Sequence, residues 1–183
     1  MGYDTALKNA WMILSKLNIG NSLSVRFLAD QYSLDFKNRE VISFSCNAKA
    51  KDFVSVLVLH YVAKNTQGLP PLEGRWHNFK ELSGIEGYQQ AFRNRVIEPA
   101  IRKYGSNPAG IFNVLERLPA RKAEQADAAV VVEVFDGVPV LVELWAGDEE
   151  FGPEANMLFD GNITDIFCIE DIIVMGGFLA ASL

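Results

Sequence analysis

Helical and strand periodicities follow one another along the first third of the chain. Between Asp4 and Leu17, apolar side chains recur at the spacing of one helix face, with Asp4 placed as the cap of this helix and Gly20 as its end. From 25 to 46 apolar residues tend to alternate with polar ones, which predicts a short antiparallel meander. Residues 52–64 are apolar on nearly every side, which is typical of a central helix that its neighbours cover almost completely.

Two further helices are expected after the break at residues 68–71. The S-x-x-E sequence at 83–86 has the form of a capping box and opens a helix that Pro99 should kink or restart. The Asn-Pro pair at 107–108 starts another helix. The charged stretch 121–124 is interpreted as a surface connection.

The clearest strand signal is a hairpin over residues 130–145. Two runs rich in β-branched residues flank the Asp-Gly pair at 136–137, which favours a two-residue turn. A short stretch at 156–159 predicts another strand, and the apolar run that begins at Glu170 predicts a terminal helix. Because helices and strands do not alternate regularly, this order predicts an α+β fold. Its mainly antiparallel sheet, the N-terminal meander plus the central 130–145 hairpin, is packed with about five helices.

Length and composition indicate a single α+β domain, 1–183. The chain is 49% hydrophobic and 22% charged, and no apolar run reaches the about 18 uncharged residues that a membrane span requires, so we expect no membrane as a partner. The net charge of −6 disfavours nucleic acid as a partner. The N-terminus lacks the features of a secretory signal, which predicts a cytoplasmic protein. The basic residues most concentrated in sequence are interpreted as a solvated helix face: Arg93, Arg95, Arg102 and Lys103.

The two cysteines, Cys46 and Cys168, lie far apart in apolar surroundings. A thiolate zinc site or an iron-sulfur cluster within one chain is therefore excluded, and both residues are expected to be buried free thiols.

The segment from Trp145 to Asp160, here called the acidic-aromatic segment, carries the most chemical information. It places five carboxylates and three aromatic residues within sixteen positions, directly after a predicted core strand. Three of the carboxylates are consecutive and repel one another, so hydrogen-bond donors, a cation or solvent must hold them. The candidate ligand-binding residues in this segment are Trp145, Asp148, Glu149, Glu150 and Phe151.

Three interpretations of the consecutive carboxylates stay open. In the structural one, they cap amides near a helical turn that starts at residues 152–154, or they are solvated. In the second, the segment holds a ligand or a divalent cation, with Asp148 and Glu150 as oxygen ligands. In the third, Glu149 is the general base of a metal-dependent enzyme. Asp160 is expected to lie at the far end of its strand, too far away to share an ion with Asp148.

A second candidate site is the loop around Arg75 and Trp76. Arg75 could donate two hydrogen bonds to an anion, and Trp76 could stack on a planar ligand or simply pin the loop. His77 lies in the same loop, whereas His60 is interpreted as a satisfied core histidine. The chain contains no G-x-S-x-G, H-E-x-x-H, Walker A or G-x-G-x-x-G sequence, so the corresponding mechanisms lack their signatures.

Several short motifs point to one protein family. They are W-x-G-D-E-E-F at 145–151, N-x-L-F-D at 156–160, Glu170-Asp171-Ile172, L-E-G-R-W at 72–76 and F-K-E-L at 79–82. Over residues 55 to 175 or so, the chain resembles an uncharacterised domain-of-unknown-function family of anaerobic bacteria and archaea. Some longer members carry an iron-sulfur segment, so the resemblance implies a link to anaerobic redox metabolism and a redox or iron-sulfur protein as partner. Gly152 and Cys168-Ile169 depart from the family pattern.

We therefore expect a cytoplasmic binding or accessory domain that holds a small ligand or divalent cation at the acidic-aromatic segment, with Arg75 and Trp76 contributing. One alternative is a divalent-metal-dependent enzyme that uses Asp148, Glu149 and Glu150. The other is a protein-protein interaction module without a small-molecule site, which docks through its edge hairpin or through the apolar terminal helix. The sequence indicates no particular cofactor.

Overall fold

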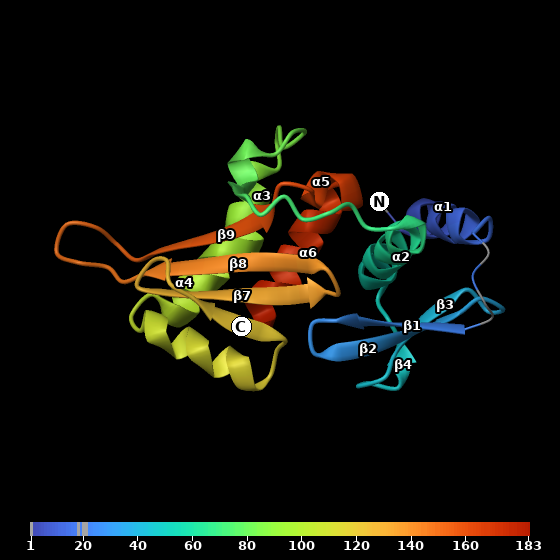
Figure 1. Cartoon of the computed structure of the whole chain (residues 1–183), viewed down its shortest axis with the longest axis horizontal. Coiled ribbons are helices and arrows are strands. Elements are labelled where there is room, and N and C mark those ends of the chain that lie inside the picture. The colour runs from blue at the N-terminus through green and yellow to red at the C-terminus, as the bar shows by residue number, and fades with distance from the viewer. Residues whose placement is uncertain (1, 18, 20–21) are drawn as a thin grey trace.

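The computed structural model describes residues 2–17, 19 and 22–183 and contains two antiparallel sheets packed with helices (Figure 1). The four-stranded sheet has the order β1-β2-β3-β4, and the five-stranded sheet has the order β5-β9-β8-β7-β6. The strands are β1 (Ser22–Phe27), β2 (Asp30–Asp35), β3 (Glu40–Ser43), β4 (Ala48–Lys49), β5 (Trp76–Asn78), β6 (Ala120–Ala123), β7 (Ala128–Phe135), β8 (Val138–Trp145) and β9 (Glu154–Asp160). The helices are α1 (Asp4–Leu14), α2 (Asp52–Gln67), α3 (Gln89–Phe92), α4 (Glu98–Tyr104), α5 (Ile163–Ile166) and α6 (Ile169–Ser182), with the 3-10 helices η1 (Phe79–Glu81) and η3 (Pro108–Glu116) and the π-helix η2 (Arg93–Ile97). This is the α+β fold that the sequence predicts.

The first helix and the meander form where the sequence predicts them, with local differences. Asp4 lies in the first turn of α1 rather than capping it, because Tyr3 occupies the cap position, and the expected end at Gly20 lies outside the described residues. The alternation in the sequence predicts Ile42 and Phe44 on the core face, but β3 buries Val41 and Ser43 instead, and Phe44, just after the strand, is 56% exposed. A strand alternates strictly, so a shift of one residue exchanges its two faces.

The predicted hairpin is the centre of the five-stranded sheet. Strands β7 and β8 meet at Asp136-Gly137, where Gly137 adopts a φ of 76°, and they pair with a register shift near Glu133, opposite Pro139. Residues 120–123 form β6, which corrects the expectation of a surface connection there. The charged side chains that suggested a loop are typical of an exposed edge strand.

Helices η2, α4 and α6 lie behind the five-stranded sheet (Figure 1). The segment that precedes η2 and α4 in the sequence differs from the prediction. The capping box occurs at η1, where Asn78 accepts from Lys80 N–H and the Glu81 carboxylate accepts from Asn78 N–H. Residues 83–86, the expected box, lie in turns. The expected effect of Pro99 is confirmed, because the helix widens into η2 and restarts as α4 just before this proline.

One apolar core continues from one sheet to the other. The ring of Phe135 stacks on Phe27 of β1 with centroids 4.6 Å apart, and on Tyr61 of α2 with centroids 4.3 Å apart. The Tyr61 hydroxyl donates to the carbonyl of Asp136 over 2.8 Å. The turn of the central hairpin is therefore held against the first sheet and the buried helix α2. Within the described part of the chain, no helix has both the length and the apolar character that crossing a membrane requires.

Candidate functional site

The consecutive carboxylates lie on a loop, residues 146–153, that joins β8 to β9 and projects from the body of the molecule (Figure 1). Asp148 shapes this acidic loop: its Oδ1 accepts the N–H groups of Glu150 at 2.8 Å and Phe151 at 2.7 Å, and its own N–H donates to the carbonyl of Phe151. The two donors to its carboxylate lower the pKa of Asp148 below its usual value. After the loop, Gly152-Pro153 leads directly into β9, so the expected helical turn at 152–154 is wrong.

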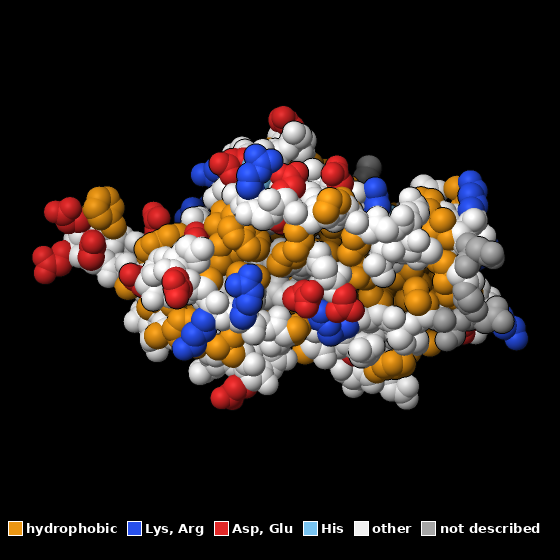
Figure 2. All heavy atoms as spheres, in the orientation of Figure 1, with side chains coloured by type: hydrophobic (Ala, Val, Ile, Leu, Met, Phe, Trp, Pro, Cys, Tyr) orange, Lys and Arg blue, Asp and Glu red, His pale blue; other side chains and the backbone are white. Residues whose placement is uncertain are grey.

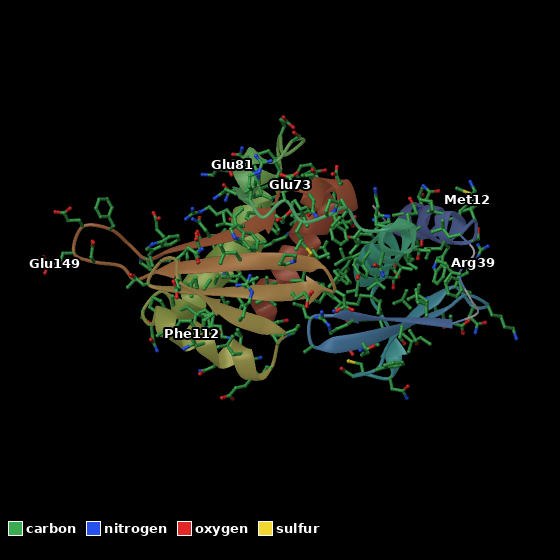
Figure 3. All side chains as sticks on the ribbon, in the orientation of Figure 1. Met12, Arg39, Glu73, Glu81, Phe112 and Glu149 are labelled. Carbon is green, nitrogen blue, oxygen red and sulfur yellow. The ribbon has the colours of Figure 1, made fainter. Side chains whose placement is uncertain are left out.

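Glu149, Glu150 and Phe151 face solvent from the acidic loop. Phe151 is 69% exposed, and Figures 2 and 3 show a hydrophobic side chain standing among carboxylates, with Glu149 directed away from the body. In the described residues, no three His, Cys, Asp or Glu side chains come together in a way that could hold a metal ion. Metal binding by Asp148 and Glu150 therefore stays a prediction.

The base of the acidic loop is closely packed. A Cβ added at Gly105, at the end of α4, would lie 2.8 Å from side-chain atoms of Pro153. Only a glycine allows the two segments to approach so closely. The loop is therefore braced against α4 where it enters β9.

Arg75 and Trp76 do not join the acidic loop. Trp76 pairs with Asp160 at the far end of β9, whereas Trp145 pairs with the first residue of that strand. Arg75 forms an ion pair with Glu73 at 2.6 Å. These predicted ligand-binding residues thus lie at opposite ends of a seven-residue strand.

Asp160 has a structural role at its end of β9. Its nearly buried carboxylate accepts the N–H groups of Glu73 and Gly74, both at 2.8 Å, and so fastens the linker before β5. The expectation that Asp160 lies at the other end of the strand from Asp148 agrees with this placement.

His60 faces α6, where its Nδ1 lies 2.7 Å from Oδ2 of buried Asp171. This hydrogen bond raises the pKa of His60, against the opposing effect of desolvation. The Cys168 Sγ donates to the same carboxylate over 3.2 Å, and desolvation and then the charge of Asp171 raise the pKa of the thiol to about 12. The thiol is therefore protonated near neutral pH and is a poor nucleophile. Both cysteine residues are exposed as a whole, contrary to the expected burial, although the Sγ atom of Cys168 is turned towards the buried Asp171.

A groove runs along the free edge of β9, opposite η1, α3 and η2. Two cavities of 270 and 320 Å³ form it, and they share lining residues on both walls. We call this the β9 groove. The shared lining residues are Lys80, Arg93, Ile97, Ala155 and Asn156.

The β9 groove combines a buried aromatic floor with cationic side chains. Phe79 and Phe92 stack with centroids 4.0 Å apart and planes inclined by 4°, and Met157 lies beside them in the lining. Arg93 pairs with Glu98 at 2.8 Å, which leaves other guanidinium N–H groups for a ligand. Lys80 is exposed and has no ion-pair partner among the described residues.

The π-helix η2 places Arg93 and Ile97, its first and last residues, in the groove lining. Proline lacks an N–H group and its ring clashes with the carbonyl four residues earlier, so Pro99 favours a widened turn at this point. Single π turns inside helices occur frequently at functional sites. The π-helix is thus a second indication of a functional site at the β9 groove, independent of the charges of Lys80 and Arg93.

Among the residues that the structure describes, no strand pairs with the first part of β9 on the side of the groove. β5 pairs with Leu158, Phe159 and Asp160, so residues 154–157 have no described partner on this side. The N–H of Gly161 donates to the carbonyl of Arg75, so Gly161 directs its backbone groups to the β5 side of β9. Every second residue of a strand directs its N–H and C=O groups to the same edge, so those of Met157 and Ala155 are directed to the groove.

The sequence did not predict that Lys80 and Arg93 line the same groove. From the sequence, Arg93 is interpreted as part of a solvated helix face, and Lys80 occurs only within a family motif. Two features of the sequence could have indicated the groove. One is Pro99 inside a helical pattern, and the other is the second half of the acidic-aromatic segment, which supplies one wall of the groove. No sequence rule connects these two segments across the fold.

Comparisons with known proteins add a family and nothing more specific. No curated protein matches the chain, and no solved structure matches it. A family model described as Domain of unknown function (DUF3786) matches residues 11–182, a longer stretch than the one over which the resemblance is expected. The chain therefore belongs to the DUF3786 family of domains of unknown function.

Proposed function

We propose that this protein is a binding module that holds a small carboxylate-bearing ligand in the β9 groove. The observation that carries the proposal is that Lys80 and Arg93 both line the two cavities of the groove, beside a floor of stacked aromatic rings. The proposal keeps the binding role that the sequence predicts, but it moves the site from the acidic loop to the strand that follows.

The groove suits a small anion with an apolar part. Charge-assisted hydrogen bonds from Arg and Lys to a carboxylate are about twice as strong as neutral ones, and the arginine fork can donate two at once. Asn156 and Gln90 add polar amide groups to the lining, while Phe79 and Phe92 supply apolar surface. The cavities have about the size of the smaller ligand pockets.

The test is calorimetric titration with benzoate, succinate and inorganic phosphate. The Lys80→Ala, Arg93→Ala double variant should bind the preferred carboxylate about 10–100-fold more weakly than the wild type, as expected for the loss of charge-assisted bonds. The matched control is Arg102→Ala, Lys103→Ala, which removes the same charge from exposed positions of α4 outside the groove lining. Equal binding by both double variants, or no binding of any probe by the wild type, would contradict the proposal.

The metal-dependent enzyme is a separate proposal with less support. It needs Asp148, Glu149 and Glu150 to converge on one ion, whereas Oδ1 of Asp148 is engaged with two amides of its own turn. No observation on the remaining carboxylates favours a reaction.

An interaction module that uses the central hairpin or the terminal helix is not favoured either. Strands β7 and β8 are each paired on both sides, and Leu179 of α6 is buried in the core. The link to anaerobic redox metabolism and to an iron-sulfur partner rests on the sequence resemblance alone.

A further inference from the structure

We propose that the β9 groove also receives the acidic loop of a second copy of this chain, in a twofold dimer built on the free edge of β9. This inference rests on the proposed function, because it requires Lys80 and Arg93 to accept carboxylates. It names a macromolecular source of those carboxylates: residues 148–150 of the other copy.

The free edge supplies the backbone part of the contact. Residues 154–157 pair with no strand of the described chain on the groove side, and unpaired strand edges are templates for pairing with another chain. Two copies that pair antiparallel through the same edge form a closed, isologous contact, in which each contributes the same groups.

The sequence limits where the twofold axis can lie. Pairing centred on Ala155 places Pro153 of one copy opposite Met157 of the other. Proline has no N–H group to donate, but the carbonyl of Pro153 can accept the N–H of Met157. Beyond this point Asn78 already occupies the position beside Leu158. The chain of the second copy must therefore leave the sheet at Gly152, where a Cβ would meet nothing within 4 Å.

This exit places the acidic loop of one copy beside η1 of the other. The segment η1 follows directly from Asn78 and carries Lys80, the cation without an ion-pair partner among the residues described. Glu149 and Glu150 likewise form no ion pair within the described chain. The contact would also cover Phe151, the most exposed large hydrophobic side chain described.

Charge complementarity selects a second copy over other occupants of the edge. The loop offers three consecutive carboxylates beside an aromatic ring, whereas the groove lining offers two cations, Lys80 and Arg93, against one carboxylate, Glu154, beside aromatic rings. In a twofold dimer, the acidic loop of each copy lies in the groove of the other, so the carboxylates of both loops meet the cations of both grooves. An unrelated extended peptide would leave the acidic loops unmatched.

The experiment is sedimentation velocity over a concentration series, with two charge-reversal variants. The loop variant carries Glu149→Lys and Glu150→Lys, and the groove variant carries Lys80→Glu and Arg93→Glu. Each should dimerise at least about tenfold more weakly than the wild type, because like charges then face each other at both contacts. An equimolar mixture should restore the dimer, since loop and groove are again complementary in the mixed pair.

The control reverses the same number of charges elsewhere, with Glu116→Lys and Glu124→Lys at exposed positions outside the groove lining. This variant should dimerise more tightly than the loop variant. A monomeric wild type at every concentration, unaltered dimers in both charge-reversal variants, or a mixture that stays monomeric would each overturn the inference.

The proposed function and this inference fail in distinguishable ways. The loop variant keeps an intact groove, so it should bind benzoate or succinate as tightly as the wild type or more tightly. A wild type that binds these carboxylates but stays monomeric would end the dimer and keep the function. A groove variant that binds them as the wild type does would end both.

Discussion

Asp148 and Asp160 belong to one acidic segment, and the carboxylate of each accepts backbone N–H groups, two at Asp148 and three at Asp160. The partners of Asp148 lie two and three residues further on, so local sequence contains enough information to expect this turn. One partner of Asp160, Asn162, is also two residues further on, but the other two, Glu73 and Gly74, lie 87 and 86 residues away, and no local pattern could predict them. A run of carboxylates in the sequence thus indicates that hydrogen-bond donors are needed, but it does not indicate which segment of the chain supplies them.

Replacing Asp148 with Ala should loosen the acidic loop. The N–H groups of Glu150 and Phe151 lose their acceptor, so their hydrogen exchange should become faster while exchange in β8 is unchanged. NMR-detected exchange measures this, with Glu149→Ala as the control because no hydrogen bond to its carboxylate is present in the described chain. Equal exchange in the two variants would show that Asp148 does not hold the turn.

The pair of His60 and Asp171 predicts a pH-dependent stability. Because the pKa of His60 is raised above 6.5 in the folded protein, its ion pair contributes fully below pH 6.5 and is lost as the pH rises through the higher native pKa. His60→Gln should therefore lose about 1 kcal/mol more at low pH than at high pH. Urea unfolding of both proteins at about pH 5.5 and 8.5 tests this, and an equal difference at the two pH values would contradict it.

Local sequence signals predicted the strands and helices well where a single physical cause dominated. The Asp-Gly turn specified the central hairpin, and continuous apolar sequence specified α2. Errors arose where two causes compete. The charges of Arg121 and Lys122 suggested a loop although they lie on an edge strand, and the S-x-x-E match at 83–86 was displaced by a box five residues earlier at η1.

The paired glycines of α6 give a prediction about the packing of elements. A Cβ at Gly176 would lie 3.1 Å from Val96 of η2 and 3.3 Å from Met157 of β9, whereas at Gly177 the nearest atom is 3.7 Å away. Gly177→Ala should stabilise the protein by about 0.5–1 kcal/mol through helix propensity. The Gly176→Ala variant should be less stable than the Gly177→Ala variant by at least about 1 kcal/mol, because η2 and β9 must move away from α6 to make room for the added methyl group. Chemical denaturation measures both, and equal stabilities would contradict the close approach.

The candidate site depends on contacts that only the complete fold creates. Residues from 78–101 and from 152–157 line opposite walls of the β9 groove, and the central hairpin lies between these two segments in the sequence. The chain has a net charge of −6, yet two cations line this groove. The sequence showed the acidic loop because its charges are consecutive, whereas the cations of the groove are thirteen residues apart and looked like ordinary surface positions.

The shared core leads us to propose that the chain unfolds as one unit. Phe135 packs against both Phe27 and Tyr61, so the two sheets should lose their structure together. A variant with Trp76→Phe and Trp145→Phe retains only Trp11, which contacts Phe36 of the first half. Its fluorescence transition should coincide with the far-ultraviolet circular dichroism transition of the whole chain. Two separate transitions would indicate independent domains.

An NMR titration of the isotope-labelled protein with benzoate tests directly whether the β9 groove is the binding site. Binding in the groove should give saturable shifts of the backbone amides of Lys80, Arg93, Ala155 and Met157, which border it. These shifts should disappear in the Lys80→Ala, Arg93→Ala variant. Shifts confined to the acidic loop, or to surfaces away from the groove, would contradict the claim that this groove is the binding site.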